Sequence, residues 1–336
     1  MKLVVLLICQ CCLLIACSPA VPQIDKIQGH TMGTRYSVLW PAHPDTPASH
    51  VKSRIEQLLL NINAQMSTYQ SDSELSVFNA ASPPHKQVIS PQFAQVMAQS
   101  LALNDFTQGH FDISVGPLVN LWGFGPDLKA LTAPSQAQLD EARARVGLQA
   151  ISLQGLTLSK TQDRYLDLSA IAKGYAVDQV AKLMDELAIS AYLVEIGGEI
   201  RVQGQKPQGK AWRVAVEAPD FTARRVQKIL PLKDVAMATS GDYRNYFEED
   251  GQRYSHSIDP FSGQPIKHRL ASVTIIDESC ARADALATAM LVMGAEKAQA
   301  FAAQENIRGY FIVRTPSGFS EHLSPAFERW LNPKAR

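Results

Sequence analysis

The chain begins with an apolar segment that has the features of a bacterial signal peptide. Lys2 is followed by a largely apolar run from Leu3 to Ile15. A run of this length is short for a membrane-spanning helix and typical of the core of a signal peptide. It ends in Leu14-Ile15-Ala16-Cys17, the pattern of a bacterial lipobox, in which a small residue admits the peptidase and the cysteine is lipidated. We therefore expect residues 1–16 to be a signal peptide that is removed from the mature protein.

Lipidation of Cys17 would make the mature protein a bacterial membrane-anchored lipoprotein that faces the periplasm. Two or three acyl chains, palmitate among them, anchor a protein stably to a bilayer, whereas one does not. Ser18 follows the cysteine, which favours the outer over the inner membrane without deciding between them. Residues 17–28 are polar and contain proline, so we expect a lipidated tether before a domain at 29–336. The alternative is an ordinary signal peptide with an incidental cysteine.

Loss of this segment also changes the cysteine count. Cys9, Cys11 and Cys12 leave with it and Cys17 is lipidated, so Cys280 is the one thiol that remains. An internal disulfide is therefore impossible, and stability must come from packing. The roughly 320 residues that remain exceed what one core usually holds, so we expect two intimately packed subdomains.

The charges of the chain are balanced. Its 32 Lys and Arg residues equal its 32 Asp and Glu residues in number, and they form no basic stripe. Proteins that bind nucleic acid concentrate positive charge on one surface. The composition therefore argues against nucleic acid as a partner.

Strand and helix patterns alternate along the chain without a regular βαβ order or an internal repeat. Apolar alternation and turn residues predict strands near 34–40, 165–168, 192–196, 199–202, 212–216, 235–239 and 271–276, a turn at 154–155 and a hairpin tip at 250–251. Apolar periodicity and capping residues predict helices over 51–62, from Ser90 to near Gly109, from the Ser135-x-x-Gln138 capping box to Gly147, over 170–188, and from Ser279 to Gly294. The fold class we predict is α+β.

One stretch carries most of the polar chemistry. Residues 254–265 combine His256 and Asp259 with a Pro/Gly turn, and Asp284 and Thr288 follow four positions apart, a spacing that a helix places on one face. A carboxylate and a hydroxyl suit Mg²⁺, completed by phosphate oxygens and water, better than Zn²⁺. An exposed helix face would carry the same pair, and that alternative stays open. The histidines form no H-x-x-x-H or H-E-x-x-H pattern, so we expect no transition-metal site.

Three carboxylates have apolar neighbours in the sequence: Asp112, Asp167 and Asp259. A buried carboxylate must face a donor, a cation or a ligand, although each of these could instead lie on a wet strand face or cap a turn. Nearby glycines would let backbone approach a ligand. The chain has no Walker loop and no G-x-G-x-x-G after a strand, so neither a P-loop nor a Rossmann site is supported.

These residues resemble the ApbE family of flavin transferases, the FAD:protein FMN transferases, over nearly the whole mature length. The matching segments occur in order at compatible spacing and are Thr31-Met32-Gly33-Thr34, Met66-Ser67-Thr68-Tyr69 with Ser76-Val77-Phe78-Asn79, His110-Phe111-Asp112 with Gly116-Pro117-Leu118-Val119, residues 167–175, residues 195–199, residues 238–241, residues 254–265 and Ala283–Thr288.

The resemblance implies two packed α/β lobes with FAD in the cleft between them. It implies transfer of FMN to a threonine hydroxyl of an acceptor flavoprotein, such as a redox-complex subunit with a Ser/Thr-Gly-Ala-Thr-like segment, with release of AMP. The FAD-site residues that it implies are Met32, Tyr69, His110, Phe111, Asp112, Asp167, Lys173 and Ile258. The Mg²⁺ ligands that it implies are Asp284, Thr288 and main-chain oxygens of Ala170 and Ala287. Relatives vary at His110 and Lys173.

Transfer to a hydroxyl also requires removal of a poorly acidic proton. His256 is the candidate base, because an imidazole titrates near neutral pH. It could instead only contact the ligand, and Asp259 could orient the imidazole or cap the turn at Pro260. Two other functions stay open. One is a Mg²⁺-dependent FAD pyrophosphatase that releases FMN and AMP, and the other is a non-catalytic FAD-binding lipoprotein, which would need neither base nor metal.

Overall fold

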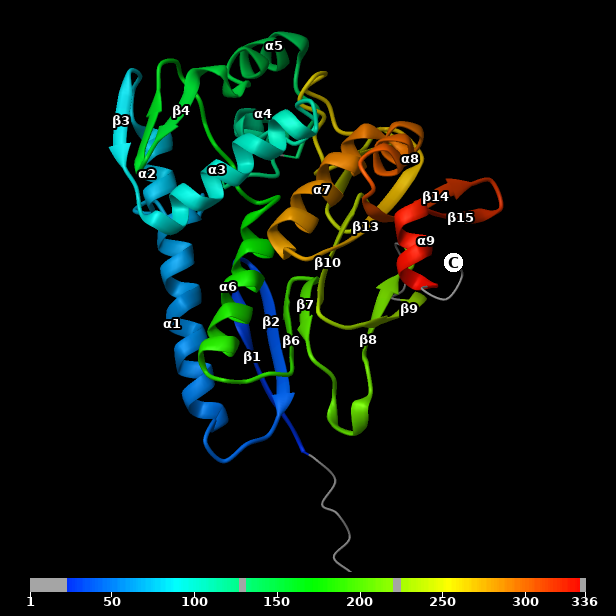
Figure 1. The fold of residues 1–336 in the computed structure, drawn as a ribbon. Coiled ribbons are helices and arrows are strands. Elements are labelled where there is room, and N and C mark those ends of the chain that lie inside the picture. The colour runs from blue at the N-terminus through cyan, green and yellow to red at the C-terminus, as the bar shows by residue number, and fades with distance from the viewer. Residues whose placement is uncertain (1–22, 127–130, 220–224, 333–336) are drawn as a thin grey trace, which may run out of the picture.

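An eight-stranded sheet forms the centre of the computed structural model (Figure 1). The structure describes residues 23–126, 131–219 and 225–332. In spatial order its strands are β1 (Ile24–Thr31), β2 (Thr34–Pro41), β6 (Tyr192–Ile196), β7 (Glu199–Gln203), β10 (Val235–Gly241), β13 (Leu270–Asp277), β14 (Arg308–Thr315) and β15 (Gly318–Leu323). Every neighbouring pair is antiparallel. The sheet therefore confirms an α+β fold rather than a parallel α/β one.

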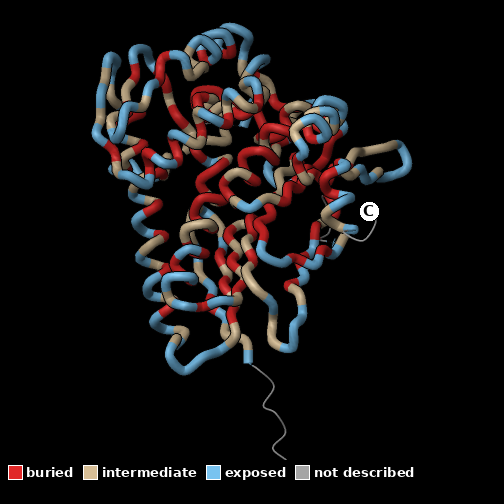
Figure 2. Tube along the Cα trace, in the orientation of Figure 1, coloured by how far each residue is buried: buried red, intermediate tan, exposed pale blue. Residues whose placement is uncertain are grey.

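Long helices cover one face of this sheet. They are α1 (Ala48–Met66), α6 (Ala172–Glu186) and α7 (Cys280–Met293), and α3 (Pro91–Phe106) and α8 (Ala295–Gln304) pack beside α7 and β14. Val194 and Ile275 of the sheet share a core with Ile55, Val177 and Leu286 of these helices. Figure 2 shows this buried interior between the sheet and the helices. Burial of these apolar side chains is the main driving force for the arrangement.

A smaller layer covers the opposite face. The hairpin of β8 (Trp212–Glu217) and β9 (Val226–Leu232) and the helix α9 (Pro325–Leu331) contribute Trp212, Leu230 and Phe327 to a second core, where they meet Val202 and Met237 of the sheet. The central sheet is thus buried on both faces, which explains why β13 is buried along nearly its whole length.

A further part of the chain packs across the ends of the helices. It comprises the three-stranded sheet β3 (His85–Val88), β5 (Thr157–Lys160), β4 (Ile151–Gln154), the helices α2 (Glu74–Ala80), α4 (Gly116–Leu121) and α5 (Gln136–Ala144), the hairpin β11 (Tyr246–Glu249) and β12 (Gln252–Ser255), and 3₁₀ turns η1 (Ile113–Val115) and η2 (Leu148–Ala150); η3 (Pro207–Gly209) precedes β8. Ile151 and Leu158 of the small sheet belong to the same core as the central sheet. The two parts are therefore intimately packed, as expected.

Local sequence signals located the starts of helices well, although α5 ends at Ala144 rather than at the predicted Gly147. Ser135 and Gln138 form the predicted capping box of α5, and Ser279 caps α7, which ends at Gly294. Asp250 and Gly251, at the tip of the β11–β12 hairpin, both have positive φ, as a tight hairpin turn requires. Among the described residues, none of the helices is long and apolar enough to cross a membrane.

Two sequence predictions were wrong. Residues 165–168 form no strand, because their backbone groups bond to side chains and a loop rather than to a neighbouring strand. The expected tether at 17–28 ends earlier than predicted, since β1 begins at Ile24, pairs with β2 and buries Ile27. Cys17 and the predicted signal peptide lie outside the described residues.

Candidate functional site

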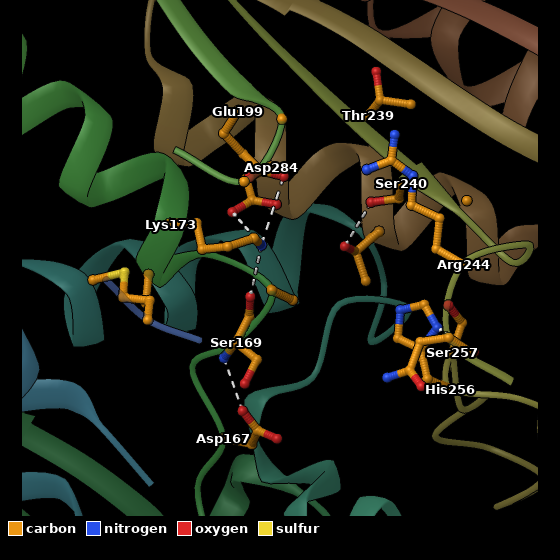
Figure 3. Close-up of a pocket in the computed structure, with 18 of the residues that line it drawn as sticks. Asp167, Ser169, Lys173, Glu199, Thr239, Ser240, Arg244, His256, Ser257 and Asp284 are labelled. Carbon is orange, nitrogen blue, oxygen red and sulfur yellow. Dashed lines mark hydrogen bonds and ion pairs between the residues drawn. The ribbon is translucent and has the colours of Figure 1, made fainter. Parts of the chain in front are cut away.

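A cavity of about 660 Å³ lies where the two parts of the fold meet. Its walls include almost all the predicted site residues, namely Met32, Tyr69, His110, Phe111, Asp112, Asp167, Ala170, Lys173, His256, Ile258, Asp284 and Thr288. Ala287, the other predicted metal-site residue, is fully buried on α7 next to Thr288 and is not among the lining residues. A cavity of this size suits a small organic ligand or cofactor. The segments that resemble one family thus converge on one site, which Figure 3 shows from close by.

A close helix crossing creates one wall of the cavity. A Cβ atom at Gly174 of α6 would lie 2.4 Å from the carbonyl oxygen of Cys280 at the start of α7, so only glycine permits this approach. The backbone N–H of Gly174 donates to Oδ2 of Asp284 at 3.0 Å. One turn further along α7, the Thr288 hydroxyl lies 3.0 Å from the hydroxyl of Ser240 on β10. The predicted Asp/Thr pair therefore faces the cavity rather than solvent.

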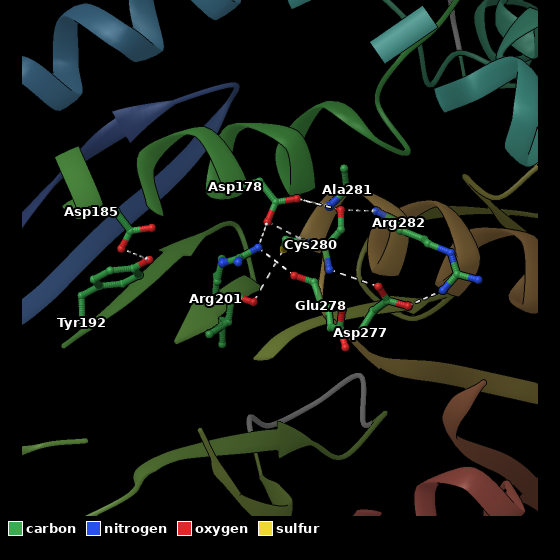
Figure 4. A network of polar contacts seen from close by, with 11 residues as sticks. Asp178, Asp185, Tyr192, Arg201, Asp277, Glu278, Cys280, Ala281 and Arg282 are labelled. Atoms are coloured by element: carbon green, nitrogen blue, oxygen red, sulfur yellow. Dashed lines mark hydrogen bonds and ion pairs between the residues drawn. The ribbon is translucent and has the colours of Figure 1, made fainter. Parts of the chain in front are cut away.

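The N-terminus of α7 is fixed by Asp178 of α6 (Figure 4). Its carboxylate accepts hydrogen bonds from the backbone N–H groups of Cys280 and Ala281, at 3.0 and 3.1 Å, and from the Ser279 hydroxyl at 2.8 Å. Arg201 of β7 donates to the same carboxylate at 2.8 Å. A carboxylate at a helix N-terminus satisfies exposed N–H groups and complements the helix dipole. This network holds in place the helix that carries Asp284 and Thr288.

Lys173 lies between two buried carboxylates. Its Nζ is 3.7 Å from Oδ2 of Asp284 and 3.6 Å from Oε1 of Glu199, and it donates to the carbonyl of Ser169 at 3.3 Å. Burial alone would lower the pKa of Lys173, but the two carboxylates raise it above its ordinary value. Burial raises the pKa of both Asp284 and Glu199. Oε2 of Glu199 is buried without a hydrogen-bond partner, so this carboxylate still needs a cation or a hydrogen-bond donor.

The loop that carries Asp167 and Ala170 is held by buried polar groups. The side-chain amide of Asn79 donates to the carbonyl of Leu166 at 2.9 Å and accepts from its N–H at 2.8 Å. The buried Lys160 donates to the backbone carbonyl of Asn79 at 3.0 Å. Because these contacts replace a neighbouring strand, the loop is fixed without regular secondary structure. The Asp167 carboxylate, in turn, accepts from the N–H of Ser169 at 2.8 Å.

The carboxylates singled out in the sequence have different positions. Asp112 caps η1, where Oδ1 accepts from the N–H and the hydroxyl of Ser114 at 2.7 and 2.6 Å, and burial raises its pKa. Asp112 and Asp167 both line the cavity, whereas Asp259 does not. The Asp259 carboxylate instead accepts from the N–H of Phe261 and the hydroxyl of Ser262, at 3.0 and 2.7 Å. Of its two predicted roles, Asp259 therefore has the turn-capping one.

His256 is oriented by the backbone. Its Nδ1 lies 3.0 Å from the carbonyl oxygen of Asn245, and Phe124 lies edge-on to the ring with centroids 6.3 Å apart. Because a carbonyl only accepts, Nδ1 carries the proton and Nε2 is left with the lone pair. Burial lowers the pKa of His256 below its ordinary value near 6.5. The imidazole is therefore neutral at physiological pH and able to accept a proton through Nε2.

The charges around the cavity are unequal. Six carboxylates line it, those of Asp112, Asp167, Glu195, Glu199, Glu217 and Asp284, against the two basic side chains of Lys173 and Arg244. Among the described residues, no group of three His, Cys, Asp or Glu side chains is arranged to hold a metal ion. A group of three such side chains is not needed for a hard cation, which one carboxylate, a hydroxyl, main-chain oxygens and substrate phosphate can bind together. The carboxylates of the wall favour the binding of such a cation. A carboxylate, a hydroxyl and main-chain oxygens are hard donors, so the residues present fit a hard cation such as Mg²⁺.

Among the lining residues that were not predicted as site residues are Glu199, Ser240 and Arg244. Glu199 follows the Gly197-Gly198 turn between β6 and β7, a pattern that had only indicated a backbone approach to a ligand. Ser240 lies in β10, within the family-matching segment 238–241, but was given no role of its own. Arg244 follows β10 and has no local sequence signal that separates it from an exposed polar residue. The positions of Ser240 and Arg244 depend on the pairing of β10 with β13 and on the turn that follows.

Comparisons with known proteins agree on one family. The family model described as "ApbE family" matches residues 32–311. A "FAD:protein FMN transferase" of Vibrio cholerae is 45% identical over 322 residues, which is 95% of this chain and 96% of that protein. The Haemophilus influenzae protein of the same name is 43% identical over 321 residues, 93% of each chain.

Solved structures give the same result. "Flavin Transferase ApbE from Vibrio cholerae" superposes with a TM-score of 0.86 at 43% identity, over 92% of this chain and 99% of that one. An apo "flavinyl transferase ApbE" from Pseudomonas stutzeri has a TM-score of 0.85 at 41% identity, over 92% and 97% of the two chains. The antiparallel sheets described above are thus those of a known fold.

Proposed function

The chain belongs to the ApbE family and is a FAD:protein FMN transferase, and we propose that it attaches FMN to a threonine hydroxyl of an acceptor flavoprotein as a phosphodiester, releasing AMP. The observation that carries this proposal is the convergence, in one cavity, of His256 with the Asp284 and Thr288 pair. A general base and a hard-cation site are the two elements that phosphoryl transfer to a hydroxyl needs. The acceptor is a flavoprotein that presents a Ser/Thr-Gly-Ala-Thr-like segment.

FAD binds along the cavity. The proposed contacts are those of Met32, Tyr69, His110, Phe111, Asp112, Asp167, Lys173 and Ile258. Tyr69 is largely exposed at the edge of the cavity, whereas Phe111 is buried, so the site has an open end and a closed one. The open end gives the acceptor chain access to the bound FAD.

His256 removes the proton of the attacking hydroxyl. The carbonyl of Asn245 fixes the protonated Nδ1, which presents Nε2 as the acceptor, and the lowered pKa keeps that nitrogen unprotonated. The hydroxyl oxygen forms a bond to the FMN-side phosphorus while the bond from that phosphorus to the AMP phosphate breaks. The proton passes to His256, and AMP leaves as a phosphate monoester.

Asp284, Thr288 and main-chain oxygens of Ala170 and Ala287 would hold Mg²⁺. When bound, this ion supplies charge neutralisation at the diphosphate. Gly174 fixes the Asp284 carboxylate through its N–H, and Ser240 fixes the Thr288 hydroxyl. Lys173 lies between the carboxylates of Asp284 and Glu199, and its positive charge reduces their repulsion of the substrate phosphates.

One incubation separates transfer from the alternatives. Purified protein receives FAD, Mg²⁺ and an acceptor with a Ser/Thr-Gly-Ala-Thr-like segment, and a matched acceptor carries alanine at its last threonine. We expect flavin fluorescence on the denatured acceptor band and none on the alanine control. Free FMN without labelled acceptor would indicate a pyrophosphatase, and unchanged FAD would indicate a binding protein.

We also propose that the protein is a periplasm-facing lipoprotein, anchored through acylated Cys17. Cys17→Ala is expected to leave an unlipidated, uncleaved precursor, because the lipobox peptidase acts on the modified cysteine. Metabolic labelling with palmitate, together with the size of the protein on a gel, measures both effects. Equal label on the variant and the unaltered protein would refute the anchor.

A further inference from the structure

Arg244 is a basic side chain of the cavity that the reaction described above does not use. It lies in the bend between β10 and β11 and lines the cavity together with Ser240, Asn245 and His256. Its side chain is 51% exposed, so it is accessible to a ligand. Figure 3 shows it beside Ser240 on one side of the cavity, with Lys173 on the other. A cation therefore stands on each side of the space that the substrate would enter.

Arg244 is the basic residue better able to bind a substrate anion. The other one, Lys173, is surrounded by Asp284, Glu199 and the carbonyl of Ser169. Six carboxyl groups line the described wall, and burial raises the pKa of four of them, those of Asp112, Glu195, Glu199 and Asp284. Lys173 and Arg244 are the two basic side chains among the lining residues, so they are the side chains that can offset the charge of a diphosphate. Oppositely charged groups in a partly buried site attract more strongly than in water. An anion is therefore drawn to the side of the cavity that Arg244 occupies.

Two neighbours orient the guanidinium. Nη2 of Arg244 donates to Oε2 of Glu217, the last residue of β8, which also lines the cavity. The ring of Tyr243 lies against the guanidinium, 5.8 Å from its carbon to the ring centroid. A guanidinium has five N–H donors in a planar fork, and one carboxylate cannot take them all. The remaining donors match phosphate oxygens in bidentate geometry.

From these contacts we propose that Arg244 is a phosphate-binding catalytic residue, which grips the diphosphate of FAD from the side opposite Lys173, with Glu217 as its positioning residue. The proposal rests on the proposed function. Ser240 lies between the proposed metal ligands and Arg244. Its hydroxyl is hydrogen-bonded to the hydroxyl of Thr288, and Arg244 lies beside it. As the bond to AMP breaks, negative charge grows on the leaving phosphate, and the guanidinium is placed to neutralise it.

The test compares ligands that differ in phosphate. FAD and riboflavin are titrated into Arg244→Gln in EDTA, with flavin fluorescence as the readout, so that the metal plays no part. We expect FAD affinity to fall about 10–100-fold, the range for loss of charge-assisted hydrogen bonds, and riboflavin affinity to stay unchanged. Arg244→Lys should recover part of the loss, since lysine keeps the charge without the fork.

Arg213→Gln is the matched control. Arg213 lies on β8, as Glu217 does, but it is exposed and is not among the lining residues, so neither affinity should change. Equal losses for FAD and riboflavin in Arg244→Gln, or no loss for either, would overturn the proposal. If Arg244→Gln fails to fold, Arg244→Lys supplies the same comparison. Failure of the unaltered protein to bind FAD would instead contradict the proposed function.

Discussion

Asp284→Ala is expected to abolish FMN transfer, with a loss on the order of 10³-fold or more. Asp284 is the charged ligand proposed for Mg²⁺, and its buried carboxylate is fixed by the N–H of Gly174 and lies beside Lys173. Without it, a hydroxyl and main-chain oxygens alone would have to bind a divalent cation. Such a neutral set binds Mg²⁺ weakly, because the ion gives up its hydration shell reluctantly.

Asp284→Asn removes the negative charge of the side chain but keeps its shape. Asparagine keeps an oxygen that can accept from the N–H of Gly174, so the crossing of α6 and α7 should be preserved. We expect this variant to fold, as measured by circular dichroism, to lose the calorimetric Mg²⁺ binding of the unaltered protein, and to lose transfer with it. Full transfer by the unaltered protein in EDTA would remove the metal from the mechanism.

The sequence was most informative where structure depends on neighbours in the chain. The capping box at Ser135 and the positive-φ tip at Asp250 each need only a few consecutive residues, and both were predicted correctly. Residues 165–168 were predicted as a strand, and wrongly, because their partners are the side chain of Asn79, 87 positions from Leu166, and the carbonyl of Ile113. No pattern within a short window contains that information.

The candidate site, too, could be predicted where it depends on nearby residues and not where it depends on distant ones. The spacing of Asp284 and Thr288 correctly predicted a shared helix face, but it could not show that the face is turned into a cavity. That depends on Gly174, which lets α6 approach α7, so that Lys173 lies between the carboxylates of Asp284 and Glu199. The resemblance to a family supplied Lys173, whereas Glu199 and Arg244 became visible as site residues only in three dimensions.

His256→Ala is expected to lower the rate of transfer by a factor on the order of 10²–10⁴, the usual effect of removing a general base, while FAD affinity changes far less. The imidazole acts on the incoming hydroxyl, which is absent from the complex with FAD alone. Its loss should therefore appear in the chemical step. Titration of FAD, followed by a single turnover at saturating acceptor, measures the two quantities separately.

The pH dependence gives a second measure of the same role. Because burial lowers the pKa of His256, the unaltered enzyme should hold its rate through neutral pH and lose it only as the pH falls through a value below about 6.5. This acidic limb should be missing from the residual rate of His256→Ala. A limb that persists in the variant would assign the titration to another group.

His110→Ala is the control that distinguishes a base from a ligand contact. His110 lines the same cavity, but its Nδ1 is bonded to the carbonyl of Thr107 at 2.9 Å and its ring packs edge-on against Phe261, so it belongs to the wall. Its loss should weaken FAD binding and leave the single-turnover rate of the bound complex nearly unchanged. If His256→Ala behaves in this way too, His256 is a second wall residue, because a base that acts on the acceptor hydroxyl cannot be removed without slowing the bound complex.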